Sequence, residues 1–105
     1  MTVRLSRRAL KDIEDVRAYT LEHWGSDQWL RYFAGLSAAM DRIADDPTCG
    51  RPRDVFLKKM RSLPHEKHLI FFLPVRIGVS RAAVLRIVHQ SRNLSALTYS
   101  EDLDV

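Results

Sequence analysis

The stretch Val84–Arg92 reads Val-Leu-Arg-Ile-Val-His-Gln-Ser-Arg, a short, largely apolar segment with one arginine in its middle. Alternation along a strand puts three residues on each face: Leu85, Ile87 and His89 on one, and Val84, Arg86 and Val88 on the other. Apolar residues on both faces indicate a strand with neighbours along both edges and cover on both faces. A charge is costly there unless it reaches a groove or a partner. We therefore expect Arg86 to point out of the sheet onto a working or binding surface.

The chain has 105 residues, of which 46% are hydrophobic, and this is enough for one domain with its own core. We expect a single domain over residues 1–105, with a flexible acidic tail from about residue 98. The first residues carry no apolar signal core, and the longest apolar run, Leu69–Val75, is too short to span a membrane. Cys49 is the single cysteine, which excludes an internal disulfide. These features predict a cytoplasmic protein in which Cys49 has a structural role.

The net charge of +4 is unevenly distributed along the chain. Residues 51–92 contain 10 basic and 2 acidic side chains, whereas residues 1–50 contain 7 basic and 8 acidic ones. The last residues, 93–105, carry acidic side chains and no lysine or arginine. A concentrated positive field of this kind attracts phosphate groups or an acidic protein segment. Composition alone does not choose between these two partners.

The first quarter of the chain predicts a strand and a helix. Thr2–Leu5 alternates and is brief, which favours a strand at a sheet edge. Ser6 is expected to cap the helix that follows, and Gly25 to end it. The apolar stripe of this helix comprises Ala9, Ile13, Val16 and Thr20, with Leu10 and Trp24 beside it. Its charged side chains, Asp12 among them, are expected on the solvent face.

A second helix follows directly. We expect Ser26 to cap it and Asp45-Asp46-Pro47 to stop it. Its stripe is stronger and consists of Trp29, Phe33, Leu36, Met40 and Ile43. Because about two residues join the helices, they must be antiparallel neighbours.

After a basic loop, the sequence pattern changes to a repeat of two residues, which is typical of strands. Three strands are expected: Leu57–Leu63, Lys67–Leu73 and Val84–His89. Pro64-His65-Glu66 predicts a turn, Pro74–Arg81 a wide turn or ragged hairpin, and Leu94–Leu97 one helical turn. The predicted fold class is α+β. An N-terminal strand and an antiparallel two-helix hairpin pack on one face of a small antiparallel sheet of three to four strands.

No metal or cofactor site is indicated. The four histidines, His23, His65, His68 and His89, lack ligand spacing, and we interpret them as structural. There is no glycine-rich phosphate loop, so no cofactor is expected. What remains is the arginine set of the basic block. If Arg61 and Arg86 emerge on the sheet face that the helices leave bare, they form a basic floor for carboxylate or phosphate. Scattered solubilising charge is the alternative.

Four short motifs occur in a recognisable order: Pro47-x-x-Gly50-Arg51, Met60-Arg61-Ser62-Leu63-Pro64, His68-Leu69-Ile70-Phe71-Phe72 and Leu85-Arg86-Ile87-Val88-His89-x-x-Arg92. Together with the strand and helix hairpin before them, they resemble the ParE branch of the ParE/RelE toxin superfamily. The resemblance covers residues 2–97. Members of this superfamily are toxins of bacterial type II toxin–antitoxin modules, and their fold is similar to the one derived above.

The resemblance implies two protein partners. ParE-like toxins are held inactive by a cognate, ParD-like antitoxin in a hetero-oligomer, and freed toxins poison DNA gyrase by binding it. A basic, partly apolar groove would suit an acidic amphipathic antitoxin segment. Its expected lining is Met60, Arg61, Leu63, Phe72 and Arg86. The candidates for target contact are Arg51, Arg53, Lys58, Lys59 and Arg92. No catalytic residue, sequence-specific nucleic-acid binding or membrane partner is expected.

The RelE branch shares the fold but cleaves messenger RNA in the ribosome. That reaction needs an activated ribose 2′-OH, charge stabilisation at the phosphate and a proton for the leaving oxygen. Arg61, Arg86, Arg92 and Tyr99 could imitate this set, with Lys58 or Lys59 as a base. Against it, Arg86-Ile87-Val88-His89 has the ParE form, and arginine is a poor base. A third interpretation is a non-toxic relic that only binds its antitoxin.

Overall fold

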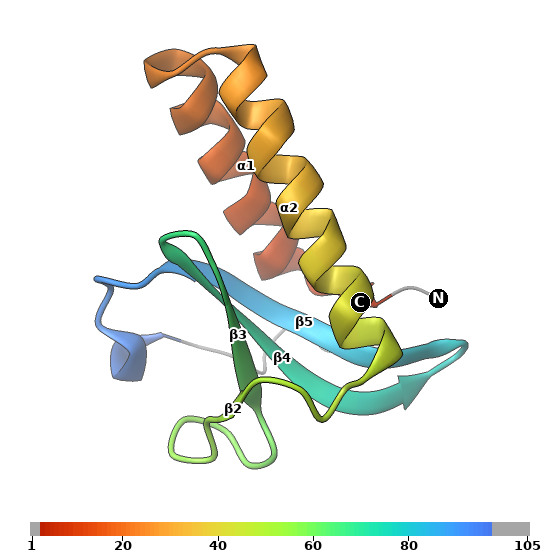
Figure 1. Ribbon diagram of the computed structural model, residues 1–105. Coiled ribbons are helices and arrows are strands. Elements are labelled where there is room, and N and C mark those ends of the chain that lie inside the picture. The colour runs from red at the N-terminus through yellow and green to blue at the C-terminus, as the bar shows by residue number, and fades with distance from the viewer. Residues whose placement is uncertain (1–2, 98–105) are drawn as a thin grey trace.

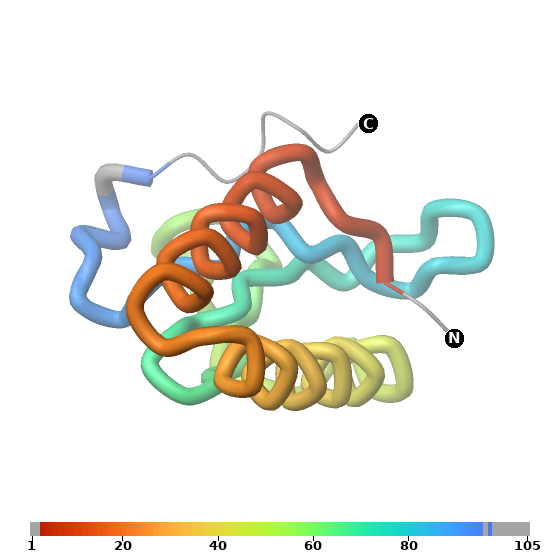
Figure 2. The backbone as a smooth tube through the Cα atoms, turned by 90° about the horizontal axis from the view of Figure 1, so that it is seen from above, coloured from red at the N-terminus to blue at the C-terminus, as the bar shows by residue number. Residues whose placement is uncertain are grey.

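The computed structural model describes residues 3–97 and shows an α+β fold, as expected (Figure 1). In chain order the elements are β1 (Arg4–Leu5), α1 (Arg7–His23), α2 (Ser26–Asp45), β2 (Arg51–Pro52), β3 (Arg61–His65), β4 (His68–Ile77), β5 (Ser80–His89) and the 3₁₀ turn η1 (Leu94–Ala96). The helical hairpin lies over one face of the sheet, and its far end projects beyond the strands. Seen from above, the helices diverge from the loop that joins them, with β4 and β5 crossing beneath (Figure 2).

The strand order in the sheet is β1-β5-β4-β3-β2. The expected edge position of the first strand and the interior position of the Val84–His89 strand are both confirmed. Two details differ from the prediction. Over the described residues the sheet has five strands, because Arg51–Pro52 pairs with Ser62 and Arg61, and it is mixed, because β1 runs parallel to β5. A two-helix crossover between β1 and the later strands allows this parallel pairing.

A bulge in β5 breaks the expected alternation of side chains. Phe72 pairs with Val84 and Phe71 pairs with Arg86, so Leu85 is the extra residue. Val84 and Ile87 consequently share one core cluster, and Leu85 and Val88 share another. The prediction that Val84 shares a face with Arg86 and Val88 is therefore wrong, whereas Arg86, opposite Phe71, stays on the face of Val88.

The two clusters cover both faces of the sheet. The helix-side cluster comprises Ala9, Tyr32, Leu36, Ile43, Leu63, Ile70, Phe72, Ala82, Val84 and Ile87. The loop-side cluster comprises Met60, Phe71, Ala83, Leu85 and Val88, with Phe56, Leu57, Leu94 and Leu97 packed against it. The sheet face away from the helices is therefore covered by the 53–60 loop and the 94–97 turn, and residues 3–97 form no bare basic floor on it.

Strand boundaries differ from the prediction because some residues expected in strands form hydrogen-bonded turns instead. Residues 53–60 form turns, in which Asp54 Oδ1 accepts a hydrogen bond from the Lys59 backbone N–H at 2.7 Å, and β3 begins only at Arg61. His65 pairs with His68, which leaves Glu66 and Lys67 as the turn. Of the two alternatives predicted for Pro74–Arg81, the ragged hairpin is found: Ile77 pairs with Ser80 across a two-residue turn, and the register shifts between Pro74 and Ile77.

The predicted cap of the first helix is confirmed, and the predicted cap of the second is wrong. Ser6 caps α1: its hydroxyl accepts a hydrogen bond from the Ala9 N–H at 3.0 Å. Ser26 is already the first residue of α2, and the residue at the cap is Gly25, which makes no side-chain cap. Within residues 3–97, neither helix combines the length and apolarity that a membrane crossing requires.

Most residues of the predicted stripes pack against the helix-side cluster, but the buried faces also include residues outside the stripes. Asp12, expected in solvent, is buried, and Tyr32 is 6% exposed. Phe33, placed in the stripe, is 40% exposed. The sheet meets the helices at an angle set by its own twist, which periodicity along one helix does not encode.

Candidate functional site

The residues predicted to line the antitoxin groove lie mostly in the core. Met60 and Phe72 are 0% exposed, Leu63 is 5% and Arg86 is 6%. Met60 belongs to the loop-side cluster, whereas Leu63 and Phe72 belong to the helix-side cluster. These side chains therefore lie on opposite faces of the sheet and do not line one groove in the free chain.

Arg86 does not look out of the sheet, and that expectation is wrong. Its Nε donates to Asp12 Oδ2 at 2.9 Å and its Nη2 to Asp12 Oδ1 at 3.1 Å. Asp12 Oδ2 also accepts the Ile87 backbone N–H at 2.8 Å. Two-point pairing of a guanidinium with a carboxylate satisfies both buried charges. The buried charge of β5 is therefore balanced by α1.

Arg61 and Arg53 hold the loop between α2 and β3. Arg61 Nε donates to the Cys49 carbonyl at 2.8 Å and Nη2 to the Gly50 carbonyl at 3.0 Å. Arg53 Nε donates to Ser62 Oγ at 2.8 Å, and its guanidinium lies 5.7 Å from the centre of the Phe71 ring. Burial is the main cause that raises the pKa of the Cys49 thiol, which keeps it protonated.

The remaining target-contact candidates are exposed. Arg51, Lys58 and Lys59 lie on β2 and the adjoining loop. Arg92 follows β5, at the end of the sheet where His68 pairs with His89. Arg51 instead pairs with Ser62, near the other end of β3. The structure thus separates Arg92 from the other three, which form a basic edge that we define as Arg51, Lys58 and Lys59.

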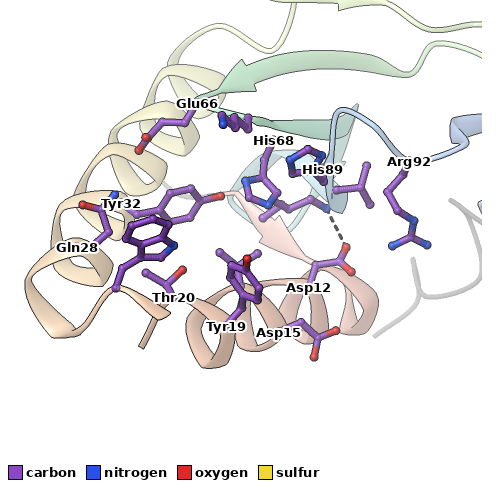
Figure 3. Close-up of a pocket in the computed structure, with 15 residues that line it drawn as sticks. Asp12, Asp15, Tyr19, Thr20, Gln28, Tyr32, Glu66, His68, His89 and Arg92 are labelled. Carbon is purple, nitrogen blue, oxygen red and sulfur yellow. Dashed lines mark hydrogen bonds between the residues drawn. The ribbon is translucent and has the colours of Figure 1, made fainter. Parts of the chain in front are cut away.

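A groove with a volume of about 580 Å³ lies where α1, α2, the β3–β4 turn and the end of β5 meet (Figure 3). We call it the hairpin groove. Its lining includes five aromatic or imidazole rings: Tyr19, Trp24, Tyr32, His68 and His89. Its charged lining includes Lys67, Glu66, Arg92 and Asp12. Of the predicted site residues, Arg92 lines this groove, whereas Arg61 lines a smaller hollow of about 330 Å³ with Lys59 and Met60.

Two polar atoms in the hairpin groove are buried without a hydrogen-bond partner among the described residues, Tyr32 Oη and His68 Nδ1. Burial, with a smaller contribution from Glu66, raises the pKa of the Tyr32 phenol. Burial, and then the neighbouring His89 and His65, lower the pKa of the His68 imidazole. Both groups are therefore neutral near neutral pH.

The histidines make structural contacts. His65 Nε2 lies 3.1 Å from the Tyr32 carbonyl, His23 Nδ1 lies 2.9 Å from the Tyr19 carbonyl, and His89 Nδ1 lies 2.7 Å from Ser91 Oγ. Among residues 3–97, no group of three or more His, Cys, Asp or Glu side chains is arranged to hold a metal ion.

The three described residues proposed for the alternative nuclease make different contacts. Arg86 is paired with Asp12, Arg61 is bonded to loop carbonyls, and Arg92 lies in the hairpin groove. Tyr99 lies outside the described residues.

Comparison with known proteins identifies the family. The model of the family described as ParE toxin of type II toxin-antitoxin system, parDE, matches residues 3–94. This chain belongs to the ParE toxin family. The ParE resemblance seen in the sequence motifs is therefore confirmed.

Individual ParE proteins align with nearly the whole chain. Toxin ParE1 of Caulobacter vibrioides is 36% identical over 93 residues, which cover 89% of this chain and 93% of that toxin. Toxin ParE1 of Mycobacterium tuberculosis is 33% identical over 86 residues, which cover 82% of this chain and 86% of that toxin. A solved structure described as the chromosomal ParDE TA system from P. aeruginosa has a TM-score of 0.68 at 18% identity, covering 85% of this chain and 95% of that one. This last likeness shows that the two chains share a fold.

Sequence reasoning missed Asp12 and Tyr32, the two residues that organise the hairpin groove. A signal for Asp12 was present, because a charge inside an apolar strand requires a partner of opposite sign. The sequence offers 13 acidic residues for that role, so the partner could not be chosen without the fold.

Proposed function

We propose that this ParE-family toxin inhibits DNA gyrase by binding it and is neutralised by a ParD-like antitoxin in a hetero-oligomer. The observation that carries the proposal is the family match over residues 3–94. The solved relative described as a ParDE system supports a partnered state. Because gyrase is an enzyme of the bacterial cytoplasm, the proposal places the toxin's action there.

The position of the arginines supports a binding mechanism over catalysis. Charge stabilisation at a scissile phosphate requires several cations directed at one point. Arg86 is held by Asp12 inside the fold, and Arg61 is held by two loop carbonyls. Both guanidiniums are thus engaged by partners within the fold, which supports a role in contact over a role in catalysis.

We propose the basic edge of Arg51, Lys58 and Lys59 as the surface that contacts the target. All three side chains are exposed. An acidic antitoxin segment that covered this edge would block the target by occupying the same charges. The antitoxin-contact set of Met60, Arg61, Leu63, Phe72 and Arg86 stays a prediction. Arg61 is its most accessible member, and the other four could meet a partner only if the core opened.

The test is a supercoiling assay with purified gyrase, ATP, relaxed plasmid and the full chain, scored for lost supercoiling and for linear DNA. We expect both, and we expect the co-expressed antitoxin to reverse them. A triple variant, Arg51→Gln, Lys58→Gln and Lys59→Gln, should lose potency with unchanged thermal stability. The matched control makes the same charge change on the helices, Arg17→Gln, Arg31→Gln and Arg42→Gln, and should keep its potency.

The other outcomes identify the alternatives. If folded, antitoxin-free protein in clear excess leaves supercoiling unchanged, gyrase inhibition is wrong. Cleavage of messenger RNA in translating ribosomes would then identify the RelE-like nuclease. Tight antitoxin binding without any effect on growth would identify a relic.

A further inference from the structure

Three histidines lie in line across one end of the sheet. His65 on β3 pairs with His68 on β4, and His68 pairs with His89 on β5. Residues directly opposite each other on neighbouring strands point to the same face, with their Cβ atoms about 4.5–5.5 Å apart. The rings of His68 and His89 are 5.6 Å apart, centre to centre (Figure 3). We call these three residues the histidine row, in which a charge on one member acts directly on the next.

The histidine row packs against the first half of α2. The Tyr32 ring centre lies 4.8 Å from that of His65 and 5.5 Å from that of His68. His65 Nε2 lies 3.1 Å from the Tyr32 carbonyl, and because a carbonyl only accepts hydrogen bonds, this nitrogen carries the proton. Three residues later, a Cβ at Gly35 would lie 2.5 Å from His65 Cε1. The His65 ring is therefore in close contact with α2 at a position where a side chain would not fit.

The packing of the row suits neutral imidazoles. His68 Nδ1 is buried and has no hydrogen-bond partner among residues 3–97. An imidazolium carries protons on both nitrogens, so a charged His68 would bury an N–H there without an acceptor. His89 Nδ1 accepts the Ser91 backbone N–H at 3.1 Å, and protonation of that nitrogen would remove the bond. Burial, and then the neighbouring His89 and His65, lower the pKa of His68.

The charges around the histidine row do not balance several added protons. The titratable and charged groups that face it are Tyr32 from α2, Asp12, Asp15 and Tyr19 from α1, Glu66 and Lys67 from the β3–β4 turn, and Arg92 after β5. Asp12 and Asp15 are each paired with a cation outside the row. Glu66 is the remaining carboxylate of this set, and its Oε2 lies 3.7 Å from His65 Nε2. One imidazolium can therefore be balanced by Glu66, whereas a second has no open carboxylate in the set.

We propose that the histidine row is a pH-sensitive contact that releases α2 from the sheet when more than one of its members is protonated. Repulsion between neighbouring imidazoliums acts at the end of the sheet, where the Tyr32 and Gly35 contacts hold α2. Leu63 lies two residues before His65 on the same face of β3 and shares the helix-side cluster with Tyr32. Acid thus uncovers core surface beneath α2 while β4 and β5 stay paired. The proposal is independent of gyrase inhibition.

Trp29 provides the measurement, because its ring stacks on that of Tyr32 with 6.1 Å between centres. In the Trp24→Phe chain Trp29 is the single tryptophan, and the change removes an exposed ring. Acrylamide quenching of its fluorescence is followed from about pH 7.5 to about pH 5. We expect quenching to rise as the pH falls below 6.5, the ordinary pKa of histidine. Each proton that the open form binds one pKa unit more tightly raises its population about tenfold.

Two variants should move the opening in opposite directions. His89→Gln removes an exposed member of the row and should shift the midpoint of the quenching change to lower pH. Glu66→Gln removes the balancing carboxylate and should shift the midpoint to higher pH. The control His23→Gln changes an exposed histidine of α1 outside the row and should leave the midpoint unchanged.

Amide hydrogen exchange separates local opening from unfolding. The amides of Val84 and Leu85, in the middle of β5, should keep their protection over the pH range in which quenching rises. Loss of their protection together with the rise would overturn the proposal, because acid would then unfold the whole chain. Constant quenching in the parent, or an unchanged midpoint in either His89→Gln or Glu66→Gln, would also overturn it.

Discussion

Asp12 of α1 and Arg86 of β5 form a buried ion pair between residues 74 positions apart, with contacts of 2.9 Å and 3.1 Å. The same carboxylate accepts the Ile87 N–H, at the part of β5 that extends beyond its pairing with β1. Asp12 therefore both neutralises the charge of the strand and occupies a hydrogen-bond donor on its edge. An edge donor left open is a site for unwanted strand pairing.

Asp12→Ala should destabilise the protein by about 3–5 kcal/mol, because it leaves the Arg86 charge buried without its carboxylate. Urea denaturation followed by circular dichroism measures the loss. Asp15→Ala is the matched control: it removes an exposed carboxylate of the same helix, whose partner is Lys11, and should change stability little. Equal effects of the two variants would contradict a structural role for the Asp12–Arg86 pair.

Ser6→Ala should cost about 1–2 kcal/mol of stability. The Ser6 hydroxyl accepts from the Ala9 N–H at 3.0 Å and donates to the Leu85 carbonyl at 2.8 Å, so the change removes a helix cap and a link to β5 together. Ser26→Ala should have almost no effect, because Ser26 makes no cap. Thermal melting of the two variants in parallel tests this, and a large loss in Ser26→Ala would be the contrary result.

Gly50→Ala should destabilise more than Gly25→Ala. Both glycines have positive φ, +85° and +89°, so each substitution carries a strain of about 1–3 kcal/mol. A methyl group at Gly50 would also overlap the Ser62 carbonyl, whereas nothing lies near the one at Gly25. The difference between the two variants in urea midpoint isolates the overlap, and no difference would show that the loop before β2 adjusts freely.

Stability should fall as pH drops through and below 6.5, the ordinary pKa of histidine. The folded pKa of His68 is lowered, so the unfolded chain binds more protons in this range and protonation favours unfolding. The groups facing His68 are Tyr32 from α2, His65 and Glu66 from the β3–β4 hairpin, His89 from β5 and Asp12 from α1. Urea midpoints measured from about pH 5 to about pH 7.5 should flatten in His68→Gln but not in His23→Gln, whose ring is exposed.

Met60→Ala should cost about 2–5 kcal/mol, as expected for a fully buried side chain. Val55→Ala, in the same loop but 84% exposed, should stay within about 0.5 kcal/mol of the parent. Calorimetry on both variants measures this. A small loss in Met60→Ala would indicate that the loop over it opens readily, and would favour the predicted role of Met60 in antitoxin contact.

Much of the fold was predictable because its signals are local. The apolar composition of Val84–His89 required an interior strand, the Ser6 cap marked the start of α1, and two joining residues made the helices antiparallel. The ordered motifs around Arg61 and Arg86 also placed the chain with the ParE toxins, and the family match confirms it.

The site was less predictable because it depends on contacts between distant residues. The bulge at Leu85 changes which side chains share a face, and nothing within β5 alone requires it. The 53–60 loop covers the second face of the sheet, and Met60 is buried there. The basic residues next to Met60 in the sequence instead suggested an exposed segment.

Composition, periodicity and motif order were enough to assign the fold class, the toxin family and an interior strand that carries one arginine. They did not reveal that Arg86 is buried against Asp12, or that Tyr32 and His68 lie in one groove. These contacts depend on how close α1, α2 and β5 come to one another, and that closeness is set by the twist of the sheet beneath the helices.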